Sequence, residues 1–196
     1  MFIGLTGGIG TGKTTVSNYL KSKGYVVLDA DAVAREIVEP GSETLSLLSD
    51  AFGEEILSPD GSLNRQHLAK IAFSDAKKKE TLDRIMHGKI IEIMFDRGRR
   101  MIENEPFVFF DVPLLFESGM DHHMDQVWLV DASLEVQIQR VMERDKSSRQ
   151  DVLRRIGHQM DRDEKIRRST VILNNCRCKE TLYRQIDTIL NKLKEK

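Results

Sequence analysis

The sequence predicts an α/β protein built on a parallel sheet, and three observations carry this prediction. An apolar run at residues 2–6 leads into a glycine-rich loop, a helical pattern and a second apolar run at 25–28. The runs at 107–111 and 127–131 are almost continuously apolar and each ends in an acid, as in parallel strands that are covered on both faces. The stretch 32–105 shows helical spacing and no strong strand signal.

The amino-terminal part is expected to form a strand, a glycine loop, a helix and a second strand. In the helix, Val16 and Leu20 lie four residues apart and therefore share one face. Gly24 is suited to end this helix, because glycine readily adopts the left-handed conformation that follows a last helical turn. This order makes a βαβ unit, in which the strands run parallel with a right-handed crossover.

Residues 32–105 are expected to form a helical insertion. Turn-forming residues at Pro40-Gly41, at Pro59-Asp60-Gly61 and at Gly88 are expected to separate its helices. The apolar positions that recur at helical spacing are Leu45, Leu48 and Phe52, then Leu68, Ile71 and Ala72, and then Leu82, Ile85 and Met86.

The carboxyl-terminal part is expected to form a helix, a charged segment, a strand and a last helix. Ser133 is a suitable cap for the first helix, with Ile138, Val141 and Met142 on one face. The segment 144–168 has many arginines and acids but few apolar anchors, so we expect it to be mobile. The last strand and helix are marked by apolar residues at 171–173 and at Leu182, Ile186, Ile189, Leu190 and Leu193.

The composition limits the class of protein. The chain has 196 residues, 40% hydrophobic and 31% charged, with 30 Lys and Arg against 31 Asp and Glu and a formal net charge of -1. This balance excludes a disordered polyelectrolyte and provides no basic excess for nucleic acid. Any anionic ligand therefore requires a local site. The length suits one compact domain.

Cysteine usage and hydropathy favour a soluble cytoplasmic protein. Cys176 and Cys178 form neither a disulfide framework nor a four-ligand zinc site. The amino terminus lacks the usual pattern of an export signal. The most apolar later stretch, 106–116, is interrupted by Asp111 and is too short to span a bilayer. We expect no membrane or nucleic-acid partner, and nothing in the sequence indicates an oligomeric state.

One motif points to a chemistry. Residues 7–14, GGIGTGKT, match G-x-x-x-x-G-K-[ST] and lie after a strand and at the start of a helix. Glycines allow consecutive backbone N–H groups to face a polyphosphate, and the helix start adds its positive end. Lys13 then supplies charge for the β- and γ-phosphates, and the Thr14 hydroxyl is placed to bind Mg²⁺. The motif predicts binding of a nucleoside triphosphate such as ATP.

Other features separate a kinase from a nucleotide-dependent switch. A GTPase requires the base-reading motif N-K-x-D, and the nearest match, residues 191–194, lacks the aspartate. The D-x-x-G at 50–53 lies in the helical insertion and is expected to be a helix end. A helical insertion and an arginine-rich segment suit a small-molecule kinase, in which one part holds the acceptor and the other closes and excludes water.

Three segments give the chain a close resemblance to the dephospho-CoA kinase family. They are residues 6–14, then Asp29-Ala30-Asp31 with Arg35 and Glu39-Pro40-Gly41, and then Val112-Pro113-Leu114-Leu115-Phe116-Glu117. The resemblance continues through Gln137, Arg140, Arg144 and Asp145, then Gln159-Met160 and Lys165, to Asn174-Asn175. It covers nearly the whole chain, and its second and third segments are far more specific than the phosphate loop.

The resemblance implies an activity and an architecture. The activity is ATP- and Mg²⁺-dependent phosphorylation of the ribose 3′-hydroxyl of dephospho-CoA, the last step of coenzyme A synthesis. The architecture is a single domain of the P-loop kinase type, a three-layer fold with a five-stranded parallel sheet. Its expected parts are a core of residues 1–31, 106–143 and 168–196, a helical CoA-binding part of residues 32–105 and a helical lid of residues 144–167.

The resemblance also implies roles for individual residues. Asp31 is expected to be the base for the 3′-hydroxyl, whereas Asp29 better suits a helix cap. Lys13 and Arg140 are expected to stabilise charge on the transferring phosphoryl group. The residues expected to bind nucleotide are Gly8, Gly10, Thr11, Gly12, Lys13, Thr14, Thr15 and Asn175. Those expected to bind substrate are Asp31, Arg35, His87 and Glu117, although the sequence leaves open whether Arg35 and Glu117 hold the acceptor or shape the site. Those expected to bind the metal are Thr14 and Asp111.

One departure from the family pattern and two alternative functions remain. Family members commonly carry His-Pro where this chain has His87-Gly88, so the turn expected there is looser. The first alternative is another small-acceptor kinase, of the nucleoside monophosphate or shikimate type. The second is a switch or partner-binding protein that holds a nucleotide without transferring phosphate to a metabolite.

Overall fold

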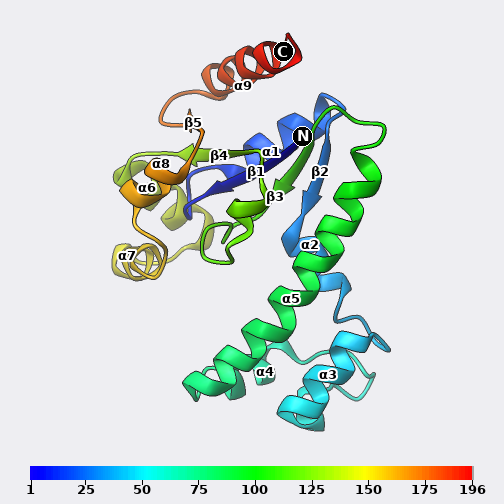
Figure 1. The fold of residues 1–196 in the computed structure, drawn as a ribbon. Helices are drawn as coiled ribbons and strands as arrows, with labels where there is room; N and C mark the ends of the chain where they lie inside the picture. The colour runs from blue at the N-terminus through cyan, green and yellow to red at the C-terminus, as the bar shows by residue number, and fades with distance from the viewer. Residues whose placement is uncertain (196) are drawn as a thin grey trace. The chain divides into compact units, whose positions relative to one another are not determined.

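The computed structural model describes residues 1–195 and divides into two compact units. The first unit comprises Met1–Leu28 together with the chain from Met101 onward, and the second comprises Asp29–Arg100 (Figure 1). Among the described residues, no helix combines the length and the apolar character that a membrane crossing requires.

A five-stranded, all-parallel sheet forms the centre of the first unit, which confirms the predicted fold class. The strands are β1 (Phe2–Gly7), β2 (Val26–Asp29), β3 (Val108–Asp111), β4 (Gln126–Asp131) and β5 (Val171–Asn174). Their order in the sheet is β2-β3-β1-β4-β5. Ile3 of β1 is paired with Phe109 of β3 on one side and with Gln126 of β4 on the other.

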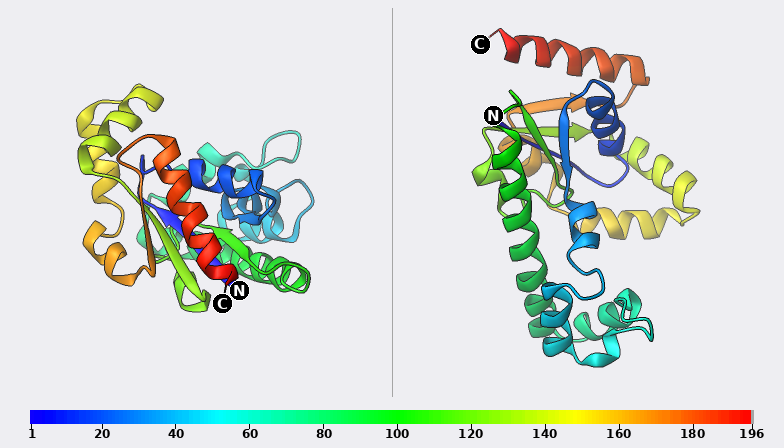
Figure 2. Two further views of the ribbon diagram at one scale, coloured as in Figure 1. Left: turned by 90° about the horizontal axis from the view of Figure 1, so that it is seen from above. Right: turned by 90° about the vertical axis from the view of Figure 1, so that its right-hand side faces the viewer.

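Helices cover both faces of the sheet. Helices α1 (Lys13–Ser22) and α9 (Lys179–Lys194) pack on one face, where the buried side chains of Ile3, Leu5 and Trp128 contact them. Figure 2 shows α9 crossing above the strands, close to α1. Alternate β1 residues point to the opposite face, where a Cβ on Gly4 would lie only 2.7 Å from a Leu115 methyl carbon.

Helix α6 (Leu134–Asp145) begins after Ser133, as predicted, although in the described chain the Ser133 side chain makes no capping hydrogen bond. Ile138 and Val141 are buried. The prediction that Met142 shares their face is wrong, because Met142 is 36% exposed. The buried residues of α6 include a glutamine, Gln137, instead of Met142.

Two short helices follow α6. Val152 of α7 (Arg149–Gly157) is completely buried and packs against Ile138 and Val141 of α6. Helix α8 (Arg162–Arg168) lies beside β4.

The second unit is helical, as its periodicity predicts. Side chains of Asp29, Ser42 and Asn64 accept hydrogen bonds at the starts of three helices, which fixes where those helices begin. Gly41 and Gly61 have φ angles of 83° and 78°, so the predicted breaks near them are confirmed. The elements are α2 (Ala30–Glu36), α3 (Glu43–Phe52), the 3-10 helix η1 (Glu54–Ile56), α4 (Arg65–Ala72) and α5 (Ala76–Met101).

The predicted break at Gly88 is wrong. Gly88 lies inside α5, which continues through 26 residues. A glycine inside a helix costs about 0.5–1 kcal/mol relative to alanine, which a long helix tolerates. The looser turn expected at His87-Gly88 is therefore absent from the described chain, and His87 is a half-buried helical residue.

Candidate active site

The phosphate-binding loop joins β1 to α1 and owes its shape to glycine. Gly10 and Gly12 have φ angles of 77° and 93°, in the left-handed region that side chains disfavour. A Cβ on Gly12 would lie 2.2 Å from Nδ2 of Asn175, and one on Gly10 would lie 2.7 Å from the Gln137 carbonyl oxygen. No larger residue fits either position without moving the loop.

The loop brings a lysine and an aspartate together. Lys13 is the first residue of α1, and its Nζ forms an ion pair with Oδ1 of Asp111, the last residue of β3. The side chains are only 15% and 5% exposed. Both charges are therefore held away from bulk water. In this position each interacts more strongly with a charged ligand than it would at the surface. Thr14 follows in the first turn of α1 and is exposed.

Arg140, Thr11 and Asn175 form a second cluster. The Arg140 guanidinium donates to the carbonyl oxygens of Thr11 at 3.4 Å and Asn175 at 2.9 Å. Nδ2 of Asn175 donates to the same Thr11 carbonyl at 2.8 Å. Asn175 follows β5, so these bonds fasten the phosphate loop to the segment after β5 and to α6. The structure thus brings three predicted site residues into contact.

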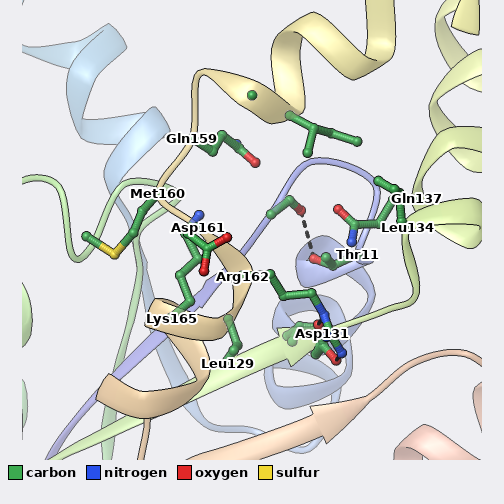
Figure 3. Close-up of a pocket in the computed structure, with 14 residues that line it drawn as sticks. Thr11, Leu129, Asp131, Leu134, Gln137, Gln159, Met160, Asp161, Arg162 and Lys165 are labelled. Atoms are coloured by element: carbon green, nitrogen blue, oxygen red, sulfur yellow. Dashed lines mark hydrogen bonds and ion pairs between the residues drawn. The ribbon is translucent and has the colours of Figure 1, made fainter.

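A pocket of 390 Å³ adjoins the loop (Figure 3). It lies between Gly8 and Thr11 of the loop, the end of β4, the start of α6 and the segment that joins α7 to α8. Its polar lining includes five side chains for which the sequence predicts no defined role: Asp131, Gln137, Gln159, Arg162 and Lys165.

Arg162 and Asp131 close one wall of this pocket. The Arg162 guanidinium donates two hydrogen bonds to the Asp131 carboxylate, at 2.8 and 2.6 Å. The hydrogen bonding to Asp131 raises the pKa of Arg162. A signal for Asp131 was available, since it ends an apolar strand at the same edge as Asp111.

Glu117 holds the segment after α7. Its Oε1 accepts a hydrogen bond from the Met160 backbone N–H at 3.1 Å and lies 3.5 Å from Nζ of Lys165. Lys165 is 3% exposed. These contacts fix neighbouring parts of the first unit, and a contact of Glu117 with substrate stays a prediction.

Three predicted site residues, Asp31, Arg35 and His87, belong to the second unit, which begins at Asp29. The Asp29 carboxylate caps α2 by accepting hydrogen bonds from the backbone N–H groups of Asp31 and Ala32 at 2.9 and 3.1 Å. This confirms Asp29 as the capping aspartate. The Asp31 side chain is exposed in the first turn of α2, and Arg35 lies one turn later on the same helix. His87 lies in α5.

Comparison with known proteins identifies the family. A family model of dephospho-CoA kinase matches residues 1–180. A dephospho-CoA kinase of Listeria monocytogenes is 41% identical over 191 residues, which are 97% of this chain and 96% of that protein. One from Corynebacterium glutamicum is 43% identical over 177 residues, 88% of this chain and 89% of that protein.

Solved structures agree with this match. Dephospho-CoA kinase from Campylobacter jejuni superposes with a TM-score of 0.75 at 25% identity, covering 98% of this chain and 96% of that one. A Thermus thermophilus structure has a TM-score of 0.85 at 37% identity, covering 98% and 97%. A shikimate kinase from Acinetobacter baumannii, 15% identical with a TM-score of 0.54 and covering 100% and 95%, shares the fold alone. The chain belongs to the dephospho-CoA kinase family.

Proposed function

We propose that this protein transfers the γ-phosphoryl group of ATP to the ribose 3′-hydroxyl of dephospho-CoA and so produces coenzyme A. The observation that carries the proposal is the shielded Lys13–Asp111 pair at the base of a glycine-shaped phosphate loop. Family membership supplies the acceptor. A kinase needs this combination, because phosphoryl transfer depends on positioning and on charge stabilisation rather than on covalent chemistry by the protein.

The loop is proposed to hold the phosphates of ATP. Its backbone N–H groups and the start of α1 provide donors and a positive end for the polyphosphate. When ATP binds, Lys13 exchanges the Asp111 carboxylate for phosphate oxygens. Among the predicted nucleotide contacts, Gly8, Thr11 and Asn175 also fix the loop, because Thr11 donates to the Gly8 carbonyl and Asn175 donates to the Thr11 carbonyl.

Thr14 and Asp111 are proposed to hold Mg²⁺. A hydroxyl and a carboxylate are suitable oxygen donors for this ion, and Asp111 is buried beside Lys13. Two oxygen ligands suit Mg²⁺, which commonly binds through few protein ligands together with substrate phosphates and water. When bound, Mg²⁺ neutralises charge on the phosphates.

Asp31 is proposed to accept the proton of the 3′-hydroxyl. It follows the carboxyl end of β2, and open α/β sheets bind ligands at the carboxyl ends of their strands. The Asp29 cap leaves the Asp31 carboxylate exposed for this role. Arg35 and His87 are proposed to bind the acceptor from the same helical part.

Arg140 is proposed to stabilise the transferring phosphoryl group. Two of its N–H donors bind backbone carbonyls. A guanidinium has five N–H donors in all, so the others are left for the phosphoryl group.

Residues 144–167 are proposed to act as a lid that excludes water from the reaction.

A cytoplasmic location is proposed because both cysteines are free and exposed, as is common in a reducing compartment.

The acceptor is tested by mass spectrometry of the products formed with Mg-ATP and, separately, dephospho-CoA, AMP and shikimate. The proposal predicts a gain of one phosphate on dephospho-CoA alone. The Lys13→Ala variant should lower kcat by about 10²-fold or more, because it removes charge stabilisation in the transition state. Transfer only to AMP or shikimate would contradict the proposed acceptor, and nucleotide binding without any transfer would favour a switch protein.

A further inference from the structure

The segment that joins α7 to α8, residues 158–161, touches the phosphate loop through one side chain. The backbone N–H of Ile9 donates to Oε1 of Gln159 at 3.0 Å, although the two residues are 150 positions apart. The backbone of the loop is therefore held at Ile9 by a side chain from the carboxyl-terminal third of the chain.

Gln159 also packs over the loop. A Cβ on Gly8 would lie 3.3 Å from Oε1 of Gln159 and 3.2 Å from Oε1 of Gln137. Gln137 is buried and donates its Nε2 to the Ala132 carbonyl at 2.8 Å, so it is held by its own helix start. Gln159 is the glutamine whose oxygen accepts from the loop. Figure 3 shows it above the pocket, facing the loop.

The backbone beside Gln159 is itself fixed. The next residue, Met160, donates its backbone N–H to Oε1 of Glu117 at 3.1 Å. The same oxygen lies 3.5 Å from Nζ of Lys165, which is almost completely buried in α8. A side chain that extends from an anchored backbone loses less entropy when it makes its hydrogen bond, so this arrangement favours the contact with Ile9.

We propose that Gln159 is a positioning residue of the nucleotide site: its side-chain carbonyl holds the phosphate loop at Ile9 and joins the loop to the segment after α7. The inference rests on the proposed function in one respect, that the loop binds ATP. Under this inference, Gln159 affects the binding of ATP and not the binding of the acceptor. One neutral hydrogen bond of this kind corresponds to roughly a 2- to 10-fold change in an equilibrium.

The contact is tested directly by amide hydrogen exchange at Ile9 in the full chain without nucleotide. Gln159→Met keeps the length of the side chain and removes the strong acceptor, so Ile9 should exchange about 2- to 10-fold faster. Gln159→Glu keeps an acceptor oxygen and should leave the exchange rate as in the wild type. The matched control is Gln139→Met, at an exposed α6 residue that pairs with Glu143; it should not change Ile9 exchange.

Steady-state kinetics separate positioning from a structural role. Gln159→Met should raise KM for ATP by about 2- to 10-fold, with KM for dephospho-CoA and the thermal midpoint unchanged. Unchanged Ile9 exchange in Gln159→Met, equally fast exchange in Gln159→Glu, or a parallel rise of both KM values would overturn the inference. Protected Ile9 in a protein that phosphorylates no dephospho-CoA would contradict the proposed function while leaving the Gln159 contact in place.

Discussion

Helices α7 and α8 come from one arginine-rich stretch, yet their basic side chains have different partners. In α8, Arg162 pairs with Asp131, whose side chain is 7% exposed, and Arg168 pairs with Asp121, whose side chain is 8% exposed. In α7, Arg149 pairs with Glu135, whose side chain is 71% exposed. These two partners of α8 are buried, whereas this partner of α7 lies at the surface.

Arginine content alone therefore does not indicate how firmly a helix is held. Ion pairs at the surface contribute little, because water and salt screen them. A pair with a buried acid fixes a helix, since separating it leaves an unpaired charge away from water. Within the proposed lid, residues 144–167, we therefore expect α7 to move more than α8.

The largest expected effect is on stability, from removing one charge in each region. Asp131→Asn weakens the two hydrogen bonds to Arg162 and should lower the free energy of unfolding by about 1–2 kcal/mol. The matched change in the other region, Glu135→Gln, should lower it by about 0.5 kcal/mol or less. Urea unfolding followed by circular dichroism measures both. Equal losses in the two variants would remove the distinction between the helices.

A smaller effect is expected from salt. Raising ionic strength from 0.1 to 1 M shortens the Debye length from roughly 10 Å to roughly 3 Å. Amide exchange in α7 should accelerate by up to about 3-fold, as expected when surface pairs worth a few tenths of a kcal/mol are screened. Exchange in α8 should stay constant. A faster α8 with an unchanged α7 would reverse the assignment.

The smallest expected effect is the pH dependence of stability that arises from Asp145, which lies at the end of α6. Hydrogen bonds from Arg144 and then from Arg155 of α7 hold the pKa of Asp145 well below its ordinary value. A carboxyl with a lowered pKa stabilises the fold above its unfolded pKa of about 3.9 and loses this contribution as the pH falls through the folded pKa.

The stabilisation that the Asp145 ion pairs contribute to the fold should therefore be constant between pH 8 and 5 and decline only below about pH 4. A carboxyl chemical-shift titration of Asp145 checks this. A midpoint at or above the ordinary aspartate value would show that the arginine bonds do not persist in solution.

Local patterns were sufficient to predict most of the fold. Continuous apolar runs indicated the strands, and helical spacing indicated the insertion, both of which the structure confirms. The predicted break at Gly88 is wrong because a breaker residue is tolerated inside a long helix. The prediction for Met142 is wrong because helical spacing does not show which residues of a face are buried: in α6 the polar Gln137, which bonds the Ala132 carbonyl, is buried, whereas Met142 is 36% exposed.

The site was predictable where its residues are contiguous and not where they are distant. The loop at 7–14 could be identified from its local sequence motif. The resemblance to dephospho-CoA kinases, to which this motif contributes, is confirmed. The Ile9–Gln159 bond and the Asp131–Arg162 pair join positions far apart in the chain, which the fold alone brings together. Gln159 fits the family pattern, yet no local signal gives its role.

The most direct test of the proposed reaction is the position of the new phosphate on the product. Purified protein, Mg-ATP and dephospho-CoA are incubated, and the product is analysed by proton and phosphorus NMR. A phosphorus–proton coupling to the ribose 3′ proton, lost when Lys13→Ala is used, is the predicted result. A phosphate on the 2′ oxygen or elsewhere on the acceptor, or no phosphorylated acceptor at all, would contradict it.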